Sequence, residues 1–411
     1  MRTSRAKRLV VAGILALAAL TVYCGGQTEK TKTEIVHWFM AEHEENLFME
    51  DLAVGFEQQN PGVGVRLEGI PRARLRTRLL SSFRAGSGPD TSVFCPEWTA
   101  EFVTVGALTE LGTSVKRWKG RKDVPEAMFE LFDDGMYCLP WQLSVPLLYS
   151  RMDRFRTGGE KPPEFQSGLI DIAEKFRKPS RNEYGLAFPG GVYGHEYWAA
   201  LALSHMSKPS FYNETGDIDL LEPDVVKGNR FFLDLYHRQH VPPSALADGP
   251  DEVVDDFLSG RTVMMIHDMT ASKPVVDRFG EDVTVSLIPM GPTGGRCVIS
   301  DSYANVVCST ARSSKHSIRW ISWLAEKDQI DVIVRAGISA AYLKSQQGTP
   351  EIEQNLFSKI TVESMPFFIR LPRHVNTGRW VEDLFAPAVR QAVSGEIDNE
   401  RMLEILQQPF E

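Results

Sequence analysis

Hydrophobic positions along the chain alternate between strand-like and helix-like spacing. The β-branched and aromatic run TEIVHWF (33–39) predicts a strand, and apolar residues from Met49 to Phe56 follow at helical spacing. NPG (60–62) then breaks the helix, and VGVRLEG (63–69) predicts a second strand. Strands that alternate with helices in this way are typical of parallel βαβ units, so we predict an α/β fold.

The same alternation continues along the chain. RARLRTRLLSSFRAG (72–86) predicts a helix with its leucines on one side, and TSVF (91–94) predicts a third strand. VTVSLIPM (283–290) predicts a strand much later in the sequence. From ARSSKHSIRWISWLAEK (311–327) to its end, the chain is predicted to be mostly helical.

The first 23 residues follow a different pattern. MRTSRAKR (1–8) is basic and has no acidic residue, and 14 apolar or small residues from Leu9 to Val22 follow it. A membrane-spanning helix needs about 20 apolar residues. A basic head before a short apolar core therefore predicts a secretory signal at residues 1–23. A buried N-terminal helix and an uncleaved anchor helix are the alternatives.

Cys24 ends the apolar run and is followed by GGQTEKTKT. This order resembles the lipobox of bacterial lipoproteins, in which a cysteine becomes the lipidated N-terminus. The lipobox usually has Leu three residues before the cysteine and a small residue just before it, where this chain has Thr21 and Tyr23. The resemblance implies a lipid anchor on Cys24 and a flexible tether over residues 24–33. Plain secretion is the alternative.

Composition narrows the class of protein further. The 411 residues suggest two or three domains, or two lobes built on one plan, and 43% hydrophobic residues are typical of a soluble globular protein. Removing residues 1–23 from a chain of net charge −9 removes four basic residues and no acid, which leaves −13. Because nucleic-acid binding depends on basic surface, this charge argues against nucleic acid as a partner.

Four cysteines follow Cys24, and none has the spacing of zinc ligands: Cys95, Cys138, Cys297 and Cys308. Export would permit disulfides, with three possible pairings, and buried free thiols are the alternative. The sequence predicts no metal site and no cofactor.

Several stretches, in their order along the chain, resemble the family 1 extracellular solute-binding proteins, a group that includes maltose-binding protein. They are FEQQNPGVGVRLEG (56–69), AGSGPD (85–90), GALTEL (106–111), GMYCLPWQLSVPLLYSRMDRF (135–155), EYGLAF (183–188), FLSGRTVMMI (257–266) and SGEIDNERMLEIL (394–406). Together the likeness covers roughly residues 34–408. It implies a monomeric receptor, anchored outside the cytoplasmic membrane, that delivers a solute to the transmembrane subunits of an ABC importer.

The resemblance also implies the architecture, a two-lobed type II periplasmic-binding fold with the ligand in a cleft between the lobes. The expected N-terminal lobe is 34–142 plus about 281–325, and the expected C-terminal lobe is 143–280 plus about 326–411. The lobes are expected to close on the solute by hinge motion.

In α/β sheets, ligands lie beyond the carboxyl ends of the strands. Residues at or near those ends are the predicted ligand contacts: Trp38, Phe39, Glu42, Glu97, Trp98, Trp141, Gln142, Tyr193, Tyr197, Trp198, His267, Asp268, Asp301, Tyr303 and Trp380. An aromatic ring covers the C–H face of a sugar, and polar groups bind its hydroxyls. The resemblance makes Trp380 the first candidate for stacking, with a core position as the alternative for Trp380, Trp98 and Trp141. Trp320 and Trp323 are predicted to pack, and Asp268 has helix capping as its alternative.

A secreted hydrolase is the competing class of protein. The sequence has no G-x-S-x-G, H-E-x-x-H or P-loop motif. Glu42 with Glu97, or Glu196 with Asp268, could form an acid pair, but any acidic cleft offers such pairs. We therefore predict a binding protein and not an enzyme.

A carbohydrate is the predicted solute, and a glycerol phosphate ester, a polyamine or a metal chelate is the alternative. Phosphate would require arginine in the cleft, and the candidates are Arg335, Arg370, Arg373 and Arg379.

Overall fold

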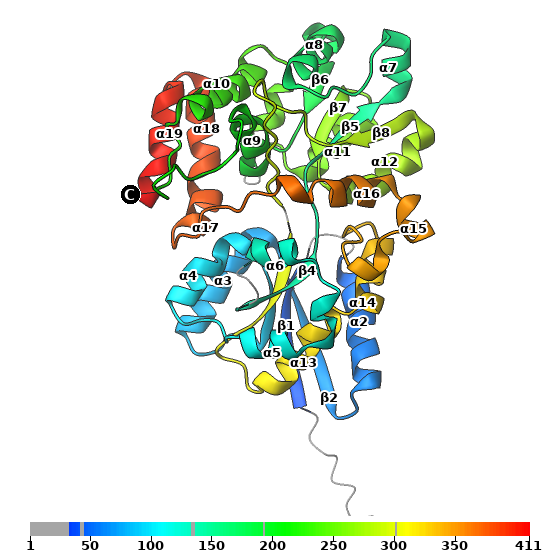
Figure 1. Ribbon diagram of the computed structural model, residues 1–411, viewed down its shortest axis with the longest axis vertical. Helices are drawn as coiled ribbons and strands as arrows, with labels where there is room; N and C mark the ends of the chain where they lie inside the picture. The colour runs from blue at the N-terminus through cyan, green and yellow to red at the C-terminus, as the bar shows by residue number, and fades with distance from the viewer. Residues whose placement is uncertain (1–32, 42–44, 133–135, 192–193, 301) are drawn as a thin grey trace, which may run out of the picture.

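The chain folds into two lobes, one above the other along the long axis of the molecule (Figure 1). The computed structural model describes residues 33–41, 45–132, 136–191, 194–300 and 302–411. Each lobe has a β-sheet, one of five strands and one of four. The predicted contacts Glu42, Tyr193 and Asp301, and the predicted anchor Cys24, lie outside the described residues.

The first lobe is built on the five-stranded sheet, in the order β2-β1-β3-β9-β4. Its strands are β1 (Thr33–Met40), β2 (Val63–Ile70), β3 (Thr91–Phe94), β4 (Cys138–Gln142) and β9 (Tyr303–Val307). β1 runs parallel to β2 and β3, and β9 runs antiparallel to β3 and β4. The carboxyl ends of β1 to β4 therefore share one edge with the beginning of β9, and this edge faces the second lobe (Figure 1).

The second lobe is built on the four-stranded sheet, in the order β6-β7-β5-β8. Its strands are β5 (Leu147–Arg151), β6 (Tyr184–Ala187), β7 (Thr262–His267) and β8 (Val283–Ser286). β8 pairs with β5, so residues 283–286 belong to this sheet and not, as expected, to the first lobe. Ile299 still packs in the second core, and the chain returns to the first lobe between Ile299 and Tyr303.

The other expected boundary, near residue 326, also moves. α14 (Lys327–Arg335) packs against α2 and β4, and Ile330 and Ile333 are buried in the first core. The first lobe therefore continues beyond α14. Two short helices, α15 (Pro350–Glu353) and α16 (Leu356–Glu363), follow and lie between the lobes (Figure 1).

Helices cover both faces of the first sheet. They are α2 (Glu45–Gln59), α3 (Arg72–Arg84), α4 (Thr99–Thr104), α5 (Gly112–Arg117), α6 (Glu126–Phe132), α13 (Ser314–Leu324) and α14. Trp320 and Trp323 of α13 are buried, with ring centroids 5.8 Å apart, and both contact Phe56 of α2. Their predicted packing role is confirmed.

Helices also surround the sheet of the second lobe. They are α7 (Met152–Gly158), α8 (Gln166–Phe176), α9 (Gly194–Ala202), α10 (Pro223–His237), α11 (Pro250–Leu258), α12 (Ser272–Phe279), α17 (Thr377–Arg379), α18 (Phe385–Ser394) and α19 (Asn399–Gln407). α9 is buried along its whole length. A Cβ at Gly228 of α10 would lie 2.0 Å from the carbonyl oxygen of Ala202, so glycine permits this close packing of α10 on the end of α9.

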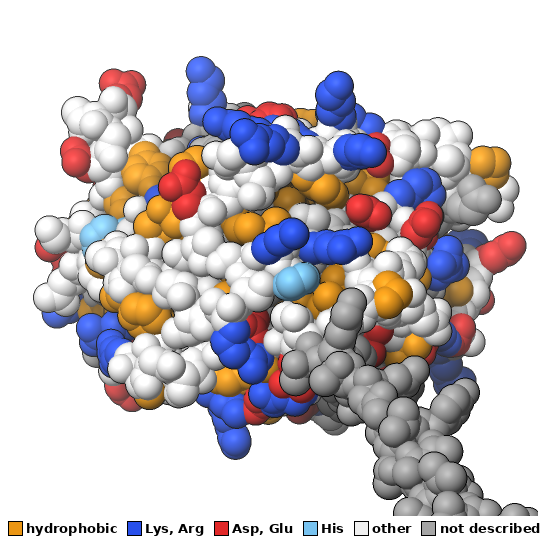
Figure 2. Space-filling view, turned by 90° about the horizontal axis from the view of Figure 1, so that it is seen from below, with side chains coloured by type: hydrophobic (Ala, Val, Ile, Leu, Met, Phe, Trp, Pro, Cys, Tyr) orange, Lys and Arg blue, Asp and Glu red, His pale blue; other side chains and the backbone are white. Residues whose placement is uncertain are grey.

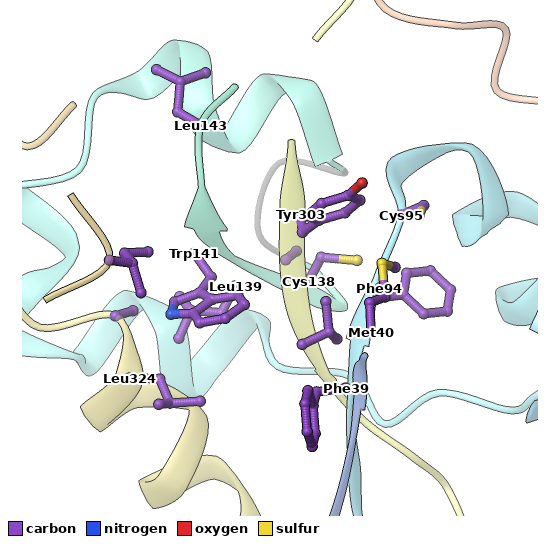
Figure 3. Close-up of a cluster of buried hydrophobic side chains, with 14 of the residues drawn as sticks. Phe39, Met40, Phe94, Cys95, Cys138, Leu139, Trp141, Leu143, Tyr303 and Leu324 are labelled. Carbon is purple, nitrogen blue, oxygen red and sulfur yellow. The ribbon is translucent and has the colours of Figure 1, made fainter. Parts of the chain in front are cut away.

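All four cysteines of the described chain are buried, and none is joined to another by a disulfide. Cys95 and Cys138 lie in the apolar cluster of the first lobe (Figure 3). Burial raises the pKa of the Cys308 thiol to about 12 and also raises the pKa of the Cys297 thiol, so both are held in the unreactive protonated form.

The end of the first lobe at which β1 begins carries basic, acidic and apolar side chains interspersed with one another (Figure 2). Within the described residues, no helix combines the length and apolar character needed to cross a membrane.

Candidate functional site

The edge of the first sheet that faces the second lobe brings together three polar side chains. Glu97 follows β3, in the short 3₁₀-helix η1 (Pro96–Trp98), and its carboxylate lies 3.4 Å from the guanidinium of Arg72. The guanidinium of Arg72 also lies 5.6 Å from the centre of the Tyr303 ring. Glu97 and Tyr303 are predicted contacts that the fold places side by side, at the ends of neighbouring strands. Figure 3 shows Tyr303 at the margin of the apolar cluster.

Arg72 was not among the predicted contacts. The sequence pattern assigned it to a basic helix, and the structure confirms that α3 begins there. The signal that could have identified it is its place, two residues after the end of β2 and thus at the same edge as Glu97. Its position relative to the end of a strand, and not its residue type, would have identified Arg72 as a candidate contact.

Trp98 is fully buried and joins the two lobes through its indole nitrogen. Trp98 Nε1 donates to Glu382 Oε1 of the second lobe at 2.9 Å. Arg76 of α3 donates to the other oxygen of Glu382 at 3.2 Å and makes a bidentate pair with Glu101 at 2.8 and 3.1 Å. Burial, with Glu97 nearby, raises the pKa of Glu382 to about 7, although Arg76 opposes the shift. No sequence motif pointed to Glu382.

Trp141 and Gln142 lie where the chain crosses from the first lobe to the second. The Trp141 ring is buried against Phe48, and its carbonyl accepts a hydrogen bond from the Tyr342 hydroxyl at 3.1 Å. Gln142 Nε2 donates to the carbonyl of Ile338 at 2.9 Å. Figure 3 shows Trp141 among apolar side chains. Burial favours the packing alternative for Trp141.

His267 is the last residue of β7 in the second lobe, Asp268 follows it, and the two side chains contact each other and nearby backbone groups. His267 Nδ1 lies 3.3 Å from the Asp268 carboxylate, and Nε2 lies 3.1 Å from the carbonyl of Pro250. Asp268 accepts from the backbone N–H of Thr270 at 2.8 Å, so the capping alternative for Asp268 is confirmed. Burial alone would lower the pKa of His267, but the charge and hydrogen bonds of Asp268 outweigh it and raise that pKa.

Trp198 and Trp380 lie in the core of the second lobe. Both are fully buried, with ring centroids 6.1 Å apart, and Phe385 contacts both rings. Trp198 Nε1 donates to Asn229 at 2.7 Å. Tyr197 is also buried and stacks on Phe188. This burial favours the packing alternative for Trp380.

Trp38 and Phe39 lie within β1, before its end, and point to opposite faces of the sheet. Trp38 is covered by Arg78 of α3, whose guanidinium lies 4.6 Å from the ring. Phe39 belongs to the buried cluster of the first lobe (Figure 3). Neither side chain reaches the edge at which Glu97 and Tyr303 meet.

A cavity of about 420 Å³ lies between α4 and α6 of the first lobe and residues 369–375 of the second. Glu97 and Ser300 line it together with apolar side chains such as Phe132. Arg370, one of the phosphate candidates, donates to the carbonyl of Glu130 at 2.7 Å. The described part of the chain has no cluster of His, Cys, Asp and Glu that could hold a metal ion.

These features define a class, the two-lobed α/β proteins with polar side chains at the edge of a sheet that faces the other lobe. Residues 41–330 match the sequence pattern of the family described as bacterial extracellular solute-binding protein. Since this match spans more than half of the chain, the protein belongs to that family.

Similar proteins agree with this assignment. A binding protein of Brucella abortus is 23% identical over 68% of this chain and 69% of its own length. A maltotriose-binding protein of Pyrococcus abyssi is 24% identical over 62% of this chain and 53% of its own. A maltose-bound protein of T. maritima has the same fold, with a TM-score of 0.81, 19% identity, and 92% and 99% of the two chains covered. The predicted two-lobed type II fold is thereby confirmed.

Proposed function

We propose that this protein is the solute-binding component of an ABC importer and that it captures a carbohydrate between its two lobes. The observation that carries the proposal is the cluster of Arg72, Glu97 and Tyr303 at the carboxyl edge of the first sheet, in a member of the solute-binding family. Relatives named as maltotriose-binding and mannitol-binding proteins support this class of solute. A solute-binding protein of Thermotoga lettingae bound to tagatose shares the fold, with 18% identity over 92% and 98% of the two chains and a TM-score of 0.80.

The chemistry of the cluster suits a polyhydroxylated ligand. A carboxylate accepts hydrogen bonds from hydroxyls, a guanidinium donates to ring and hydroxyl oxygens, and a tyrosine ring covers C–H groups. Hydrogen bonds to charged groups contribute about 1.5–3 kcal/mol each. Glu97 and Arg72 hold each other in place before a solute arrives, so little side-chain conformational freedom is lost on binding.

Closure of the lobes would complete the site. The chain crosses between the lobes through residues 143–146, between β4 and β5, and crosses back before β9 begins at Tyr303. Rotation about short crossing segments is the usual way in which such lobes close around a ligand. Small-angle scattering should give a smaller radius of gyration with solute than without it, and an unchanged radius with a solute known to be bound would argue against closure.

The same proposal includes export and anchoring. We propose that residues 1–23 are removed, that Cys24 carries the lipid, and that the mature chain is a monomer on the outer side of the cytoplasmic membrane. Thiol titration of the denatured mature protein should find four of the five cysteines of the full chain, because the thiol of a lipidated Cys24 is blocked. Mass spectrometry then identifies the first residue, and a free thiol at Cys24 would leave plain secretion.

A thermal-shift screen across monosaccharides, oligosaccharides and sugar alcohols tests the solute, since a ligand that binds only the native state raises its stability. Glu97→Gln should lower the affinity for the carbohydrate that binds most tightly about tenfold, which corresponds to a loss of about 1.4 kcal/mol of binding free energy. Glu110→Gln, an exposed glutamate elsewhere on the first lobe, is the matched control and should not change affinity. A wild-type protein that responds to no carbohydrate would overturn the solute class.

The proposed role is binding and not hydrolysis. A captured oligosaccharide should be recovered intact after long incubation with the protein, as judged by chromatography. Shortened products would instead support an acid pair in the cleft.

A further inference from the structure

Glu382 belongs to the second lobe by its chain position, but its side chain is hydrogen-bonded to Trp98 and Arg76 of the first lobe. One carboxylate oxygen accepts from Trp98 Nε1 at 2.9 Å, and the other lies 3.2 Å from Nη1 of Arg76. The donors come from η1 and α3, two elements of the first lobe. The side chains of Arg76 and Glu382 are 11% and 18% exposed, so water screens this pair little.

The backbone conformation around Glu382 directs its side chain toward the first lobe. Residues Trp380–Leu384 form a π-helix, a rare conformation that is frequent at functional sites. Trp380, at its start, is anchored in the core of the second lobe. Glu382, two residues later, points instead toward the first lobe. Burial of Trp380 therefore fixes the position of the Glu382 carboxylate relative to its hydrogen-bond donors on Arg76 and Trp98.

The lobes approach closely beside this carboxylate. A Cβ added at Gly378 would lie 2.8 Å from Nε of Arg76 and 3.1 Å from Cδ1 of Trp98. Only a glycine lets the backbone of α17 lie flat against both side chains without displacing them. Any rotation that separates the lobes at this point must break both hydrogen bonds of Glu382.

We propose that Glu382 is a clasp between the lobes: its two hydrogen bonds to Arg76 and Trp98 stabilise the closed form and thereby set the affinity of the cleft for its solute. The second half of this statement rests on the proposed function. Glu97, a candidate solute contact, lies in the same short helix as Trp98. Solute and clasp therefore stabilise the same closed arrangement, and each strengthens the other.

The clasp should respond to pH. The charged groups that act on Glu382 are Arg76 on α3 and Glu97 on η1; Glu101 of α4 is bound to Arg76, and the segment of Glu382 itself carries Arg379 and Asp383. With the lobes in contact at Glu382, burial, with Glu97, raises the pKa of Glu382 to about 7, against the attraction of Arg76. Separation of the lobes returns water to the carboxylate and its pKa toward the ordinary value of 4.5.

The sign follows from proton linkage. Because the closed form holds the proton more tightly, closure is favoured fully below pH 4.5 and is weakened as pH rises through about 7. Glutamine at this position keeps an oxygen that accepts from Trp98 but carries no charge. Glu382→Gln should therefore behave at every pH as the protonated wild type does.

Three variants test the clasp: Glu382→Gln, Glu382→Ala and Asp383→Asn. Asp383 is the matched control, because it is the adjacent acid, lies on the same π-helix and is exposed. Scattering of the solute-free protein at about pH 5.5 and about pH 8 measures closure. We expect the wild type to be more compact at the lower pH, Glu382→Gln to be compact at both, and Asp383→Asn to follow the wild type.

Glu382→Ala removes both acceptor oxygens, so it should be the most expanded at both pH values. It should also bind its solute about tenfold more weakly in calorimetry, as expected for the loss of hydrogen bonds to a charged group. Gly378→Ala provides a second variant that leaves Glu382 in place and should weaken binding in the same direction, because the methyl group separates the lobes.

Two outcomes would overturn the clasp: Glu382→Ala matching the wild type in both compactness and affinity, or Glu382→Gln keeping the pH dependence of the wild type. Thermal melts separate a folding defect from a closure defect, and the isosteric glutamine variant stays informative where alanine unfolds. Scattering is measured without solute, so a protein that binds no carbohydrate would refute the proposed function and leave the test of the clasp intact.

Discussion

The two lobes contribute different chemistry to the edges at which they face each other. In the first lobe, Arg72 and Glu97 satisfy one another across 3.4 Å and border Tyr303. In the second lobe, Asp268 is bound by the backbone of its own loop, and His267 is bound by the carbonyl of Pro250. A solute hydroxyl can join a side-chain pair more readily than it can displace a backbone cap. Direct recognition should therefore belong mainly to the first lobe, and the second should supply the scaffold.

The largest effect should come from the scaffold. Trp380→Ala should lower the free energy of unfolding by about 3–5 kcal/mol, because a fully buried tryptophan leaves a cavity among rigid aromatic neighbours. Chemical denaturation measures this directly. Solute affinity of the protein that remains folded should fall much less than tenfold.

The half-buried Trp118 of the first lobe is the control for this truncation, and Trp118→Ala should cost clearly less stability. If Trp380→Ala instead kept its melting temperature and lost affinity, Trp380 would be a stacking platform for the solute. The comparison between a recognising lobe and a supporting lobe would then fail.

Local pattern predicted the first half of the fold well. The strands expected at 33–39, 63–69 and 91–94 match β1, β2 and β3 to within about one residue, since each is a short β-branched run between turn signals. β8 was also expected as a strand, but its alternation says nothing about which sheet it joins. Hydrogen bonding to β5 places it in the second lobe.

The candidate site was less predictable, for a physical reason. The local sequence around a tryptophan that follows a strand does not show whether its ring faces a cleft or the core. Tertiary packing decides which of the two it faces. Trp141 and Trp380 were nominated by position and are buried. Arg72 and Glu382 matter through partners far away in sequence, Glu97 at a separation of 25 residues and Trp98 at 284. No local pattern encodes such pairs.

A smaller effect on stability is expected from a change in the pair of His267 and Asp268 in the second lobe. Asp268→Asn keeps an oxygen that can cap Thr270 but removes the charge that raises the pKa of His267 above its ordinary value of 6.5. The stability from that raised pKa is present below 6.5 and is lost as pH rises through the folded value. The variant should therefore be less stable by about 1–2 kcal/mol near pH 5.5 and by less near pH 8.5.

Asp277→Asn is the control for Asp268→Asn, because it breaks an exposed ion pair with Lys273 on the next helix. Exposed pairs contribute little, so its stability should change by at most about 0.5 kcal/mol at either pH. An equal loss at both pH values for Asp268→Asn would show that the cap, and not the charge, is what matters there.

The smallest effect should come from the cover on Trp38. Arg78→Ala removes a guanidinium 4.6 Å from the ring centre and should cost about 0.5–1 kcal/mol of stability, the usual size of an exposed cation–π contact.

Glu68→Gln separates the contribution of the ion pair from that of the cation–π contact, since it breaks the ion pair of Arg78 and leaves the cation over the ring. Arg74→Ala, an exposed arginine on the same helix, controls for lost charge. Solute affinity should be unchanged in all three, because Trp38 lies within β1 and not at the edge. A loss of affinity in Arg78→Ala alone, at unchanged stability, would return Trp38 to the binding site and extend recognition in the first lobe beyond Glu97 and Tyr303.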